Sequence, residues 1–218
     1  MSENNRNAFD DRAPSVNPSH FYFAGGVLVL IAVALIVFAL QLPTEPADAA
    51  TLEPEDIKIG AGLFIRDAVL LDQYASSGTS DRTDAHHCVL FFDIANGQKV
   101  VVSLAVPTSG PLFETMRAYM NDENAGPGDC RLTLCATVGA LKAQLAEYLH
   151  DYVKDVYDPL TPYQMIPVSL TMRGETPEEY TASMSRGRIL YLAGGAACLL
   201  AGAAILAAVF RKRTNVSL

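Results

Sequence analysis

The sequence lacks the short motifs by which common catalytic and nucleotide-binding sites are recognised. It contains no Walker loop, no Gly-x-Gly-x-x-Gly opening a helix, no His-Glu-x-x-His and no Gly-x-Ser-x-Gly elbow. The hydroxyls of Ser103 and Ser169 fall inside predicted strands instead. We therefore predict no catalytic residue, no cofactor and no metal site, and the sequence by itself does not identify an activity.

Charge is missing from two long stretches of the chain. Residues 21–42 form a 22-residue run whose only polar side chains are Tyr22 and Gln41, and residues 189–210 form an equally long run without charge. An α-helix rises about 1.5 Å per residue, so either run can cross roughly 30 Å of hydrocarbon. The sequence therefore predicts two transmembrane helices. Because neither contains an ionisable side chain, we expect no transport pathway or proton relay through them.

The first run has an alternative interpretation as a cleaved signal peptide. The small-x-small triplet Ala47-Asp48-Ala49 follows a few residues beyond it. However, the run exceeds the roughly 7–15 residues of a typical signal core, and a tail containing Arg6 and Arg12 precedes it. We expect a retained anchor, and cleavage after Ala49 stays open.

Basic residues at the helix ends predict the orientation. The basic triplet Arg-Lys-Arg at 211–213 directly follows the second run and favours a cytoplasmic location for the C-terminus. Arg186 and Arg188, at the other end of this run, weaken the charge difference between its two ends. We predict a two-span protein of the cell membrane with both termini in the cytoplasm and residues 43–188 outside.

The segment between the runs is acidic. Residues 43–188 contain 21 acidic and 11 basic side chains, a net charge of −10. Such a surface repels phosphate backbones and anionic lipid head groups. We therefore predict no nucleic-acid partner and no flat adsorption of this segment to the bilayer.

The first half of the segment has strand-like patterns. Alternation over residues 57–71, broken only by Asp67, predicts one long strand that bends at Gly60 and Gly62. Residues 75–83 look like a polar turn region. Two β-rich runs, 88–95 and 98–106, flank Asn96-Gly97, which is the preferred pair for a tight hairpin turn.

The second half alternates helices with strands. A helix of about 11 residues is expected to start near Pro111, followed by a strand over 131–138. An amphipathic helix over 141–156 is closed by Pro159, and Pro167 makes the last strand, 165–172, an edge or bulged strand.

This order predicts an α+β, mainly β fold for the segment between the runs. Five strands with a helix between the third and fourth match an OB-like five-stranded barrel with one added helix, and the alternative is an open α+β sheet with both helices on one face. The predicted boundaries are a disordered tail 1–20, transmembrane helix 21–42, stalk 43–56, β-rich domain 57–175, linker 176–188, transmembrane helix 189–210 and tail 211–218.

Strand phase separates the cysteines of the predicted domain. Cys88 and Cys130 are in phase with core residues, whereas Cys135 lies on the opposite face of its strand. Phase therefore permits a disulfide between Cys88 and Cys130, and the alternative is two reduced core thiols. Cys198 lies inside the second apolar run, where a packing role is expected.

Two polar groups invite a metal-site interpretation. His86 and Cys88 could share an ion, but the ligand spacing is not that of a metal site, so we expect an exposed strand start. Asp151, Asp155 and Asp158 could meet near the end of a helix as a paired-carboxylate or calcium site. A solvated helix face explains them better, since acidic side chains are mostly exposed.

The second apolar run carries small residues at four-residue spacing. Gly194, Cys198 and Gly202 form one such row, and small rows let helices approach closely in lipid. We predict that this face packs on the first span or on its twin in a homodimer. The alternative is a generic alanine-rich span.

The layout resembles that of uncharacterised two-pass bacterial membrane proteins with a small extracytoplasmic domain. The resemblance covers the two spans and the domain between them and rests on no motif, so it implies no site residues and no activity. We expect a non-enzymatic envelope protein that binds or scaffolds through its outer domain, in contact with membrane lipid. The alternatives are a membrane-anchored hydrolase or redox enzyme, and an accessory subunit bound to another membrane protein in a larger complex.

Overall fold

The computed structural model describes residues 18–79, 81–126, 128–156 and 162–214. This part of the chain contains a mixed six-stranded sheet and four α-helices, and two apolar helices flank the sheet domain in the sequence, which is an α+β organisation. The chain divides into two compact units, a helix pair from its two ends and a sheet domain over residues 42–188. Of the predicted tails 1–20 and 211–218, residues 18–20 and 211–214 belong to the two helices, and the rest lies outside the described residues.

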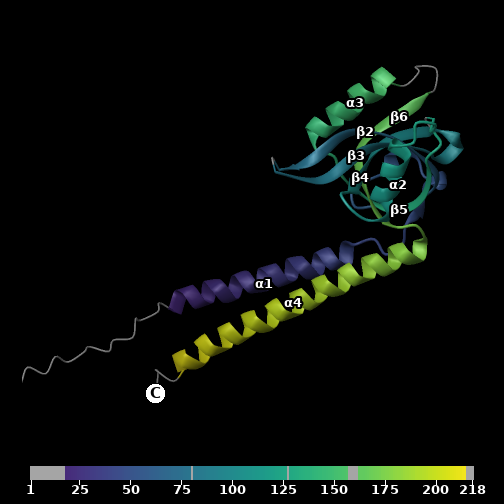
Figure 1. The fold of residues 1–218 in the computed structure, drawn as a ribbon. Coiled ribbons are helices and arrows are strands. Elements are labelled where there is room, and N and C mark those ends of the chain that lie inside the picture. The colour runs from purple at the N-terminus through teal and green to yellow at the C-terminus, as the bar shows by residue number, and fades with distance from the viewer. Residues whose placement is uncertain (1–17, 80, 127, 157–161, 215–218) are drawn as a thin grey trace, which may run out of the picture. The chain divides into compact units, whose positions relative to one another are not determined.

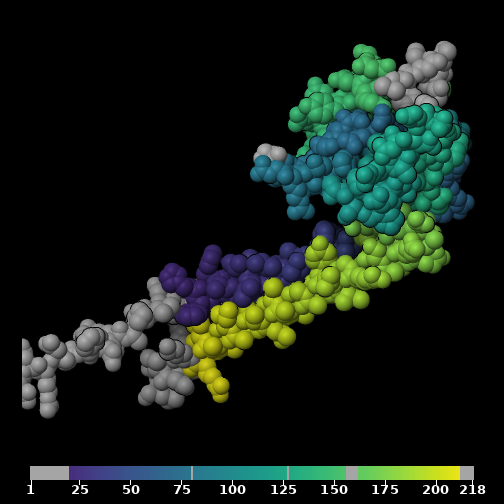
Figure 2. Space-filling view, in the orientation of Figure 1, coloured from purple at the N-terminus to yellow at the C-terminus, as the bar shows by residue number. Residues whose placement is uncertain are grey.

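The helix pair consists of α1 (Pro18–Gln41) and the apolar part of α4 (Pro177–Thr214). Tyr22 contacts Phe210 and Phe38 contacts Tyr191, in both cases edge-to-face, so the start of α1 lies beside the end of α4. The two helices therefore run antiparallel, side by side (Figure 1 and Figure 2). Both are long and apolar enough to cross a membrane.

The sheet domain pairs its strands in a closed circuit. The strands are β1 (Ala47–Asp48), β2 (Gly62–Thr79), β3 (Arg82–Asp93), β4 (Lys99–Pro107), β5 (Arg131–Ala140) and β6 (Tyr163–Gly174). Their order is β1-β2-β3-β4-β6-β5, and β2 also pairs with β5. The β1–β2 and β4–β6 pairs are parallel and the other pairs are antiparallel.

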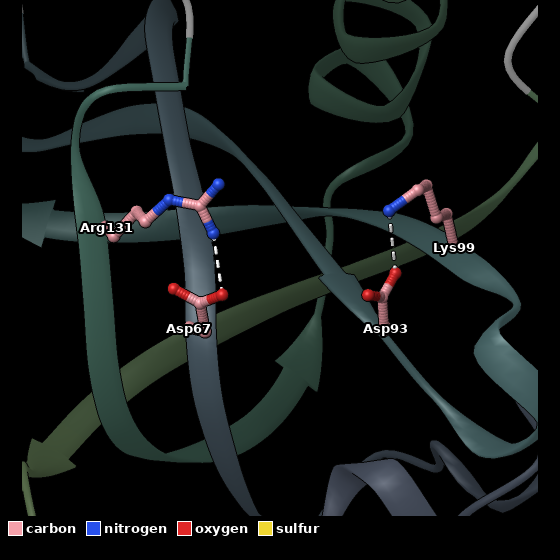
Figure 3. A network of polar contacts seen from close by, with 4 residues as sticks. All are labelled: Asp67, Asp93, Lys99 and Arg131. Carbon is pink, nitrogen blue, oxygen red and sulfur yellow. Dashed lines mark hydrogen bonds and ion pairs between the residues drawn. The ribbon is translucent and has the colours of Figure 1, made fainter.

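A bulge in β2 changes which residues face the interior. Asp67 has a φ of 54°, and the β2–β5 register shifts between Ile65 and Ala68. Ile65 and Ala68 both join the interior cluster as a result, whereas Leu71 packs on the other face of the sheet. The prediction that one face continues through residues 57–71 is therefore wrong beyond Asp67. The Asp67 carboxylate accepts a hydrogen bond from Arg131 on β5 at 2.6 Å, beside the bulge (Figure 3).

The β2–β3 hairpin is longer than predicted. Within the predicted polar turn region 75–83, residues 75–79 and 82–83 continue the two strands, with Ser77 opposite Ala85 and Thr79 opposite Arg82. Neither face of this part of the hairpin is fully buried, so polar side chains are tolerated on both. The pairing between the two backbones continues and holds these residues in strands. In Figure 1 this hairpin reaches beyond the rest of the domain.

The β3–β4 hairpin confirms the tight turn predicted at Asn96-Gly97. Both residues have positive φ, 61° and 70°, and the Gln98 N–H donates to the Ala95 carbonyl at 3.3 Å. Asn and Gly adopt this conformation at least cost. Next to the turn, Lys99 donates to the Asp93 carboxylate at 2.9 Å (Figure 3).

Two helices cover different faces of the sheet. α2 (Pro111–Met120) starts at the predicted proline and packs Met116 into the interior cluster. α3 (Ala143–Val156) packs Leu149 and Val153 against Val89 and Val101 in a second cluster on the opposite face. This excludes the alternative with both helices on one face. Pro159, predicted to close α3, lies outside the described residues.

Pro167 lies in the interior of the sheet and not at its edge. β6 pairs with β4 on one side and with β5 on the other. The β4–β6 register shifts between the pairs Val101–Met165 and Ser103–Ser169, around Pro167. Of the two predicted explanations, the bulged strand is therefore confirmed, because a bulge accommodates the missing N–H donor.

The segments expected as stalk and linker are structured. Short 3-10 turns at Ala49–Thr51 and Pro54–Asp56 follow β1, and Ile57 is buried in the interior cluster. α4 is already helical from Pro177, and its fully buried Tyr180 packs with Cys135. Both segments thus belong to the fold of the domain.

Candidate functional site

A buried polar cluster lies on the sheet face that also carries α3. It consists of Tyr74 and Ser77 on β2, His87 on β3 and Ser103 on β4. Side chains two residues apart in a strand face the same side of the sheet. His87 therefore faces the same side as Val89, and Ser103 the same side as Val101, and both valines belong to the cluster that α3 covers. Ser103 is fully buried and His87 is 6% exposed, whereas Ser77 is half-buried.

Hydrogen bonds connect the four side chains in one continuous series. The Tyr74 hydroxyl donates to Ser103 Oγ at 2.8 Å. Ser103 Oγ lies 3.4 Å from His87 Nδ1, and His87 Nε2 lies 2.9 Å from Ser77 Oγ. With Tyr74 donating to Ser103, the serine proton is free to point at Nδ1, and the Nε2 proton then points at Ser77. Each polar side-chain group of these four residues thus has a hydrogen-bond partner.

Burial keeps the cluster uncharged. Desolvation lowers the pKa of His87, and the positive charge of Lys142 and neighbouring His86 lower it further. Desolvation raises the pKa of Tyr74, although its hydrogen bond to Ser103 opposes this. Both shifts favour the neutral side chains, since burial disfavours whichever form carries charge.

The geometry does not form a nucleophile–base pair that a substrate could reach. Among the residues that the structure describes, the hydrogen bonds of both His87 ring nitrogens go to serine hydroxyls and not to a carboxylate. Ser103 Oγ is enclosed, and its 3.4 Å separation from Nδ1 is long for a strong hydrogen bond. The arrangement joins three strands and holds a neutral imidazole.

The sequence interpretation of His86-His87-Cys88 is wrong in one respect. These residues were expected at an exposed strand start, but β3 begins at Arg82, so they lie within the strand and His87 is buried. Its orientation away from His86 and Cys88 follows the predicted alternation. A histidine and a serine on otherwise apolar strand faces were the signal in the sequence that could have indicated this cluster.

His86 is engaged by an aromatic ring. It stacks on Phe113 of α2 with ring centroids 5.5 Å apart, and its Nδ1 lies 3.5 Å from Ser76 Oγ. Within the described ranges, no three His, Cys, Asp or Glu side chains gather as a metal site. Asp151 contacts neighbouring His150 at 3.4 Å, and Asp158 of the suggested carboxylate group lies outside those ranges.

The domain cysteines are buried free thiols. Cys88 Sγ donates to Met116 Sδ at 3.2 Å in the interior cluster, which Cys130 also joins. Burial raises the pKa of Cys88 to about 12, and burial together with Glu178 and Glu179 raises that of Cys135 to about 11. Burial also raises the pKa of Cys130. Thiols so shifted are poor nucleophiles at neutral pH. The Cys88–Cys130 disulfide stays a prediction.

Glycines bring the two helices of the pair together. A Cβ at Gly202 would lie 3.0 Å from the Gly25 carbonyl oxygen, and a Cβ at Gly195 would lie 2.8 Å from Ile36 Cγ1. Gly194 is looser, at 3.7 Å from Leu35, and Cys198 is half-buried. The small residues at this helix contact therefore include Gly195, which is not a member of the predicted row. Its contribution to stability in lipid stays a prediction.

Comparison of this chain with protein families, with curated proteins and with solved structures finds no match.

Proposed function

We propose that this chain is an integral protein of the cell membrane that crosses the bilayer twice and binds or scaffolds a partner through a non-enzymatic extracytoplasmic domain. One observation carries the membrane part of the proposal. Large apolar side chains are exposed along the helix pair: Phe23 is 76% exposed, Leu30 71% and Leu200 74%. Covering one such side chain is worth about 1.5–3 kcal/mol, so the pair as a whole favours hydrocarbon over water.

The surface of the sheet domain supports a different environment for that unit. Its exposed large apolar side chains, among the described residues, are Ile59 and Tyr148. The acidic excess of this segment keeps it soluble and repels anionic lipid head groups. We therefore propose that the domain lies in water beside the bilayer.

The strand pairing supports an OB-like barrel as the architecture of the domain. Three consecutive antiparallel strands, β2, β3 and β4, continue through the parallel β4–β6 pair to β5, which returns to β2. The α2 helix between β4 and β5 and the added α3 between β5 and β6 match the predicted element order. Barrels of this type bind chemically unrelated ligands, so the architecture supports a binding role but does not identify the ligand.

The chemistry of the domain favours binding over catalysis. The serine of the polar cluster is enclosed, and the three domain thiols are buried with raised pKa values. These observations weigh against the hydrolase and the redox enzyme. An independent scaffold and an accessory subunit of a larger complex both act through the surface of the domain, so both are consistent with these observations.

Cysteine labelling in intact cells tests the topology. The native thiols of the domain are buried, so a cysteine introduced at exposed Glu123 gives a site-specific signal. We expect Glu123→Cys to react with a membrane-impermeant maleimide in intact cells, and Ser217→Cys to react only after permeabilisation. Equal labelling of both in intact cells, or of neither before lysis, would contradict the proposed orientation.

Photo-crosslinking tests the binding role. A photoreactive amino acid at Ser76, on the projecting hairpin, reports on partners of the domain, and the same residue at Leu200 reports on neighbours of the helix pair. We expect a discrete protein or glycan adduct at Ser76. Adducts confined to Leu200 would shift the proposal to lateral association of the spans, and the absence of a discrete adduct at either position would contradict a scaffold.

A further inference from the structure

The first turns of α4 pack on the sheet domain through a small cluster of their own. Tyr180 and Met184, one turn apart on α4, contact Cys135 of β5, and Leu42 and Phe64 pack beside them. Tyr180 and Cys135 are fully buried, and Met184 is 9% exposed. This cluster is separate from the interior cluster that joins the strands. Segments with few buried apolar partners open at a lower free-energy cost than the core of a domain.

Tyr180 fits against bare backbone. Its ring ends at Gly62 on β2, where an added Cβ would overlap the tyrosine hydroxyl. The next residue, Thr181, donates from Oγ1 to the Thr44 carbonyl at 3.1 Å and thereby ties the helix to the segment that precedes β1. The docked position of α4 therefore depends on the absence of a side chain at Gly62.

The Tyr180 hydroxyl is enclosed without a hydrogen-bond partner among the described residues. A buried polar group without a partner destabilises the state that encloses it. Phenylalanine would fill the same space without this cost. The hydroxyl of Tyr180 therefore opposes docking and favours a state in which this side chain reaches water.

Gly187 supplies a position at which α4 can bend. It lies inside α4, beside the boundary between the two compact units, which follows Arg188. A Cβ at Gly187 would meet nothing within 4 Å, so packing does not require a glycine there, in contrast to Gly195 and Gly202. A glycine inside a helix makes that turn less stable than alanine would. The docked turns thus join the rest of α4 through a weakened turn.

We propose that residues 177–186 form a latch, which releases from the sheet domain by bending of α4 at Gly187 and so uncovers Cys135. Release hydrates the Tyr180 hydroxyl, which offsets part of the cost of exposing the small apolar cluster. The interior cluster stays closed, because Cys135 lies on the other face of β5. The latch gives the domain two forms, docked and released, next to the start of the second apolar run.

The test is the rate of maleimide labelling of Cys135 in the detergent-solubilised full chain, with the other three cysteines replaced by alanine. A matched chain that keeps Cys88 alone reports on opening of the interior cluster. Each rate is divided by that of the same thiol in the urea-unfolded chain. We expect Cys135 to react at least about tenfold faster than Cys88. Equal corrected rates would mean that both thiols are uncovered together by unfolding of the domain, which overturns the proposal.

Two variants assign the parts of the latch. Tyr180→Phe keeps the ring and removes the hydroxyl, so it should slow the labelling of Cys135 by roughly 5–150-fold. Gly187→Ala strengthens the helix at the bend and should slow labelling by roughly two- to fivefold. Gly26→Ala is the matched control, because a Cβ at this helical glycine of α1 also meets nothing within 4 Å, and it should leave the rate unchanged. Labelling that is not slowed by Tyr180→Phe overturns the role of the hydroxyl, and labelling not slowed by Gly187→Ala overturns the bend.

A third variant opens the latch. Gly62→Ala places a methyl group where the Tyr180 hydroxyl lies, so Cys135 should label faster while Cys88 keeps its rate. If circular dichroism shows that this variant has lost the sheet, Tyr180→Ala replaces it, because that change adds no atom to the strands. A folded opening variant in which Cys135 labels at the parent rate contradicts the latch. Because the labelling needs neither topology nor a partner, its failure leaves the proposed membrane function intact.

Discussion

The helix pair and the sheet domain use the same apolar residue types in opposite ways. In the domain, Leu104 and Leu90 are fully enclosed, whereas in the helix pair Leu30 and Leu200 are more than two-thirds exposed. The domain hides its apolar surface within its own fold, as water requires. The helix pair satisfies its backbone hydrogen bonds internally but leaves its side chains outward, which is the requirement set by hydrocarbon.

The two units also differ in how their parts approach one another. In the helix pair, contact depends on the absence of side chains, since Gly195 and Gly202 allow backbone approach. In the domain, contact depends on interdigitating side chains from strands and from α2 and α3. A substitution should therefore have a different effect in each unit, which makes the comparison testable.

The largest expected effect comes from a leucine truncation made once in each unit. Leu104→Ala leaves a cavity in the domain and should lower its free energy of unfolding by about 2–5 kcal/mol. The same truncation at exposed Leu200 should change the stability of the domain by less than about 0.5 kcal/mol. Urea unfolding of the detergent-solubilised chain, followed by far-UV circular dichroism of the sheet, measures both. Equal losses would remove the distinction between the units.

Next in size is a charge placed on each surface. Leu200→Arg should oppose membrane insertion by about 2.5–3.5 kcal/mol, because the guanidinium would lie in hydrocarbon. Ile59→Arg, at an exposed position of the domain, should leave insertion unchanged. The measurement is the fraction of chain that stays in membranes after an alkaline carbonate wash. Full retention of Leu200→Arg would place this helix face outside the lipid.

A smaller effect is expected from adding a side chain at the helix contact. Gly202→Leu forces a branched side chain against Gly25 and Val29, and overpacking of this kind costs about 1–3 kcal/mol. Gly26→Leu is the matched control, since a Cβ at Gly26 meets nothing within 4 Å. We expect a lower thermal midpoint in detergent for Gly202→Leu alone. If both variants melt like the parent, close approach at Gly202 does not stabilise the pair.

The smallest effect is a pH dependence confined to the domain. Burial, Lys142 and His86 lower the pKa of His87 in the folded state below its unfolded value of about 6.5. The unfolded state therefore binds the proton first, and stability decreases as the pH falls below about 6.5, until His87 also titrates in the folded state.

His87→Gln isolates this contribution, because glutamine keeps a donor and an acceptor but does not titrate. We expect urea midpoints of the parent to fall more steeply between about pH 6.5 and 5 than those of the variant. Parallel curves would show that His87 does not couple folding to pH.

Local patterns were sufficient to predict several elements. The Asn96-Gly97 hairpin, the helix beginning at Pro111 and the strand from Arg131 all form as expected. Each depends on a signal carried by neighbouring residues, namely a turn dipeptide, a helix-starting proline and period-two alternation. Such signals act over short distances, so distant parts of the chain do not change them.

Features that depend on distant pairing were missed. The alternation through residues 57–71 suggested one continuous face, but pairing with β5 introduces the bulge at Asp67 and exchanges the faces beyond it. Likewise, the polar residues 75–79 looked like a turn until their pairing with β3 extended the hairpin. Neither outcome is visible locally, because the bulge and the extension are properties of two strands together.

The candidate sites divide in the same way. Strand phase alone placed Cys88 and Cys130 toward the core and Cys135 away from it, which the core clusters confirm. Phase could not show that Met116 would reach Cys88, nor that His87 would be enclosed with Ser103. These contacts join elements that lie 16 or more residues apart in the chain.

The sequence by itself determined that two uncharged runs form helices long enough to span hydrocarbon and that the acidic segment between them is a sheet domain. Composition and short-range periodicity suffice for this, because burial preference and backbone geometry are properties of a residue and its near neighbours. Only the tertiary structure decided the closed circuit of strand pairs, the bulge, and the contacts of Cys88 with Met116 and of His87 with Ser103. Those depend on which distant strands meet and in what register, and many registers satisfy the same local pattern.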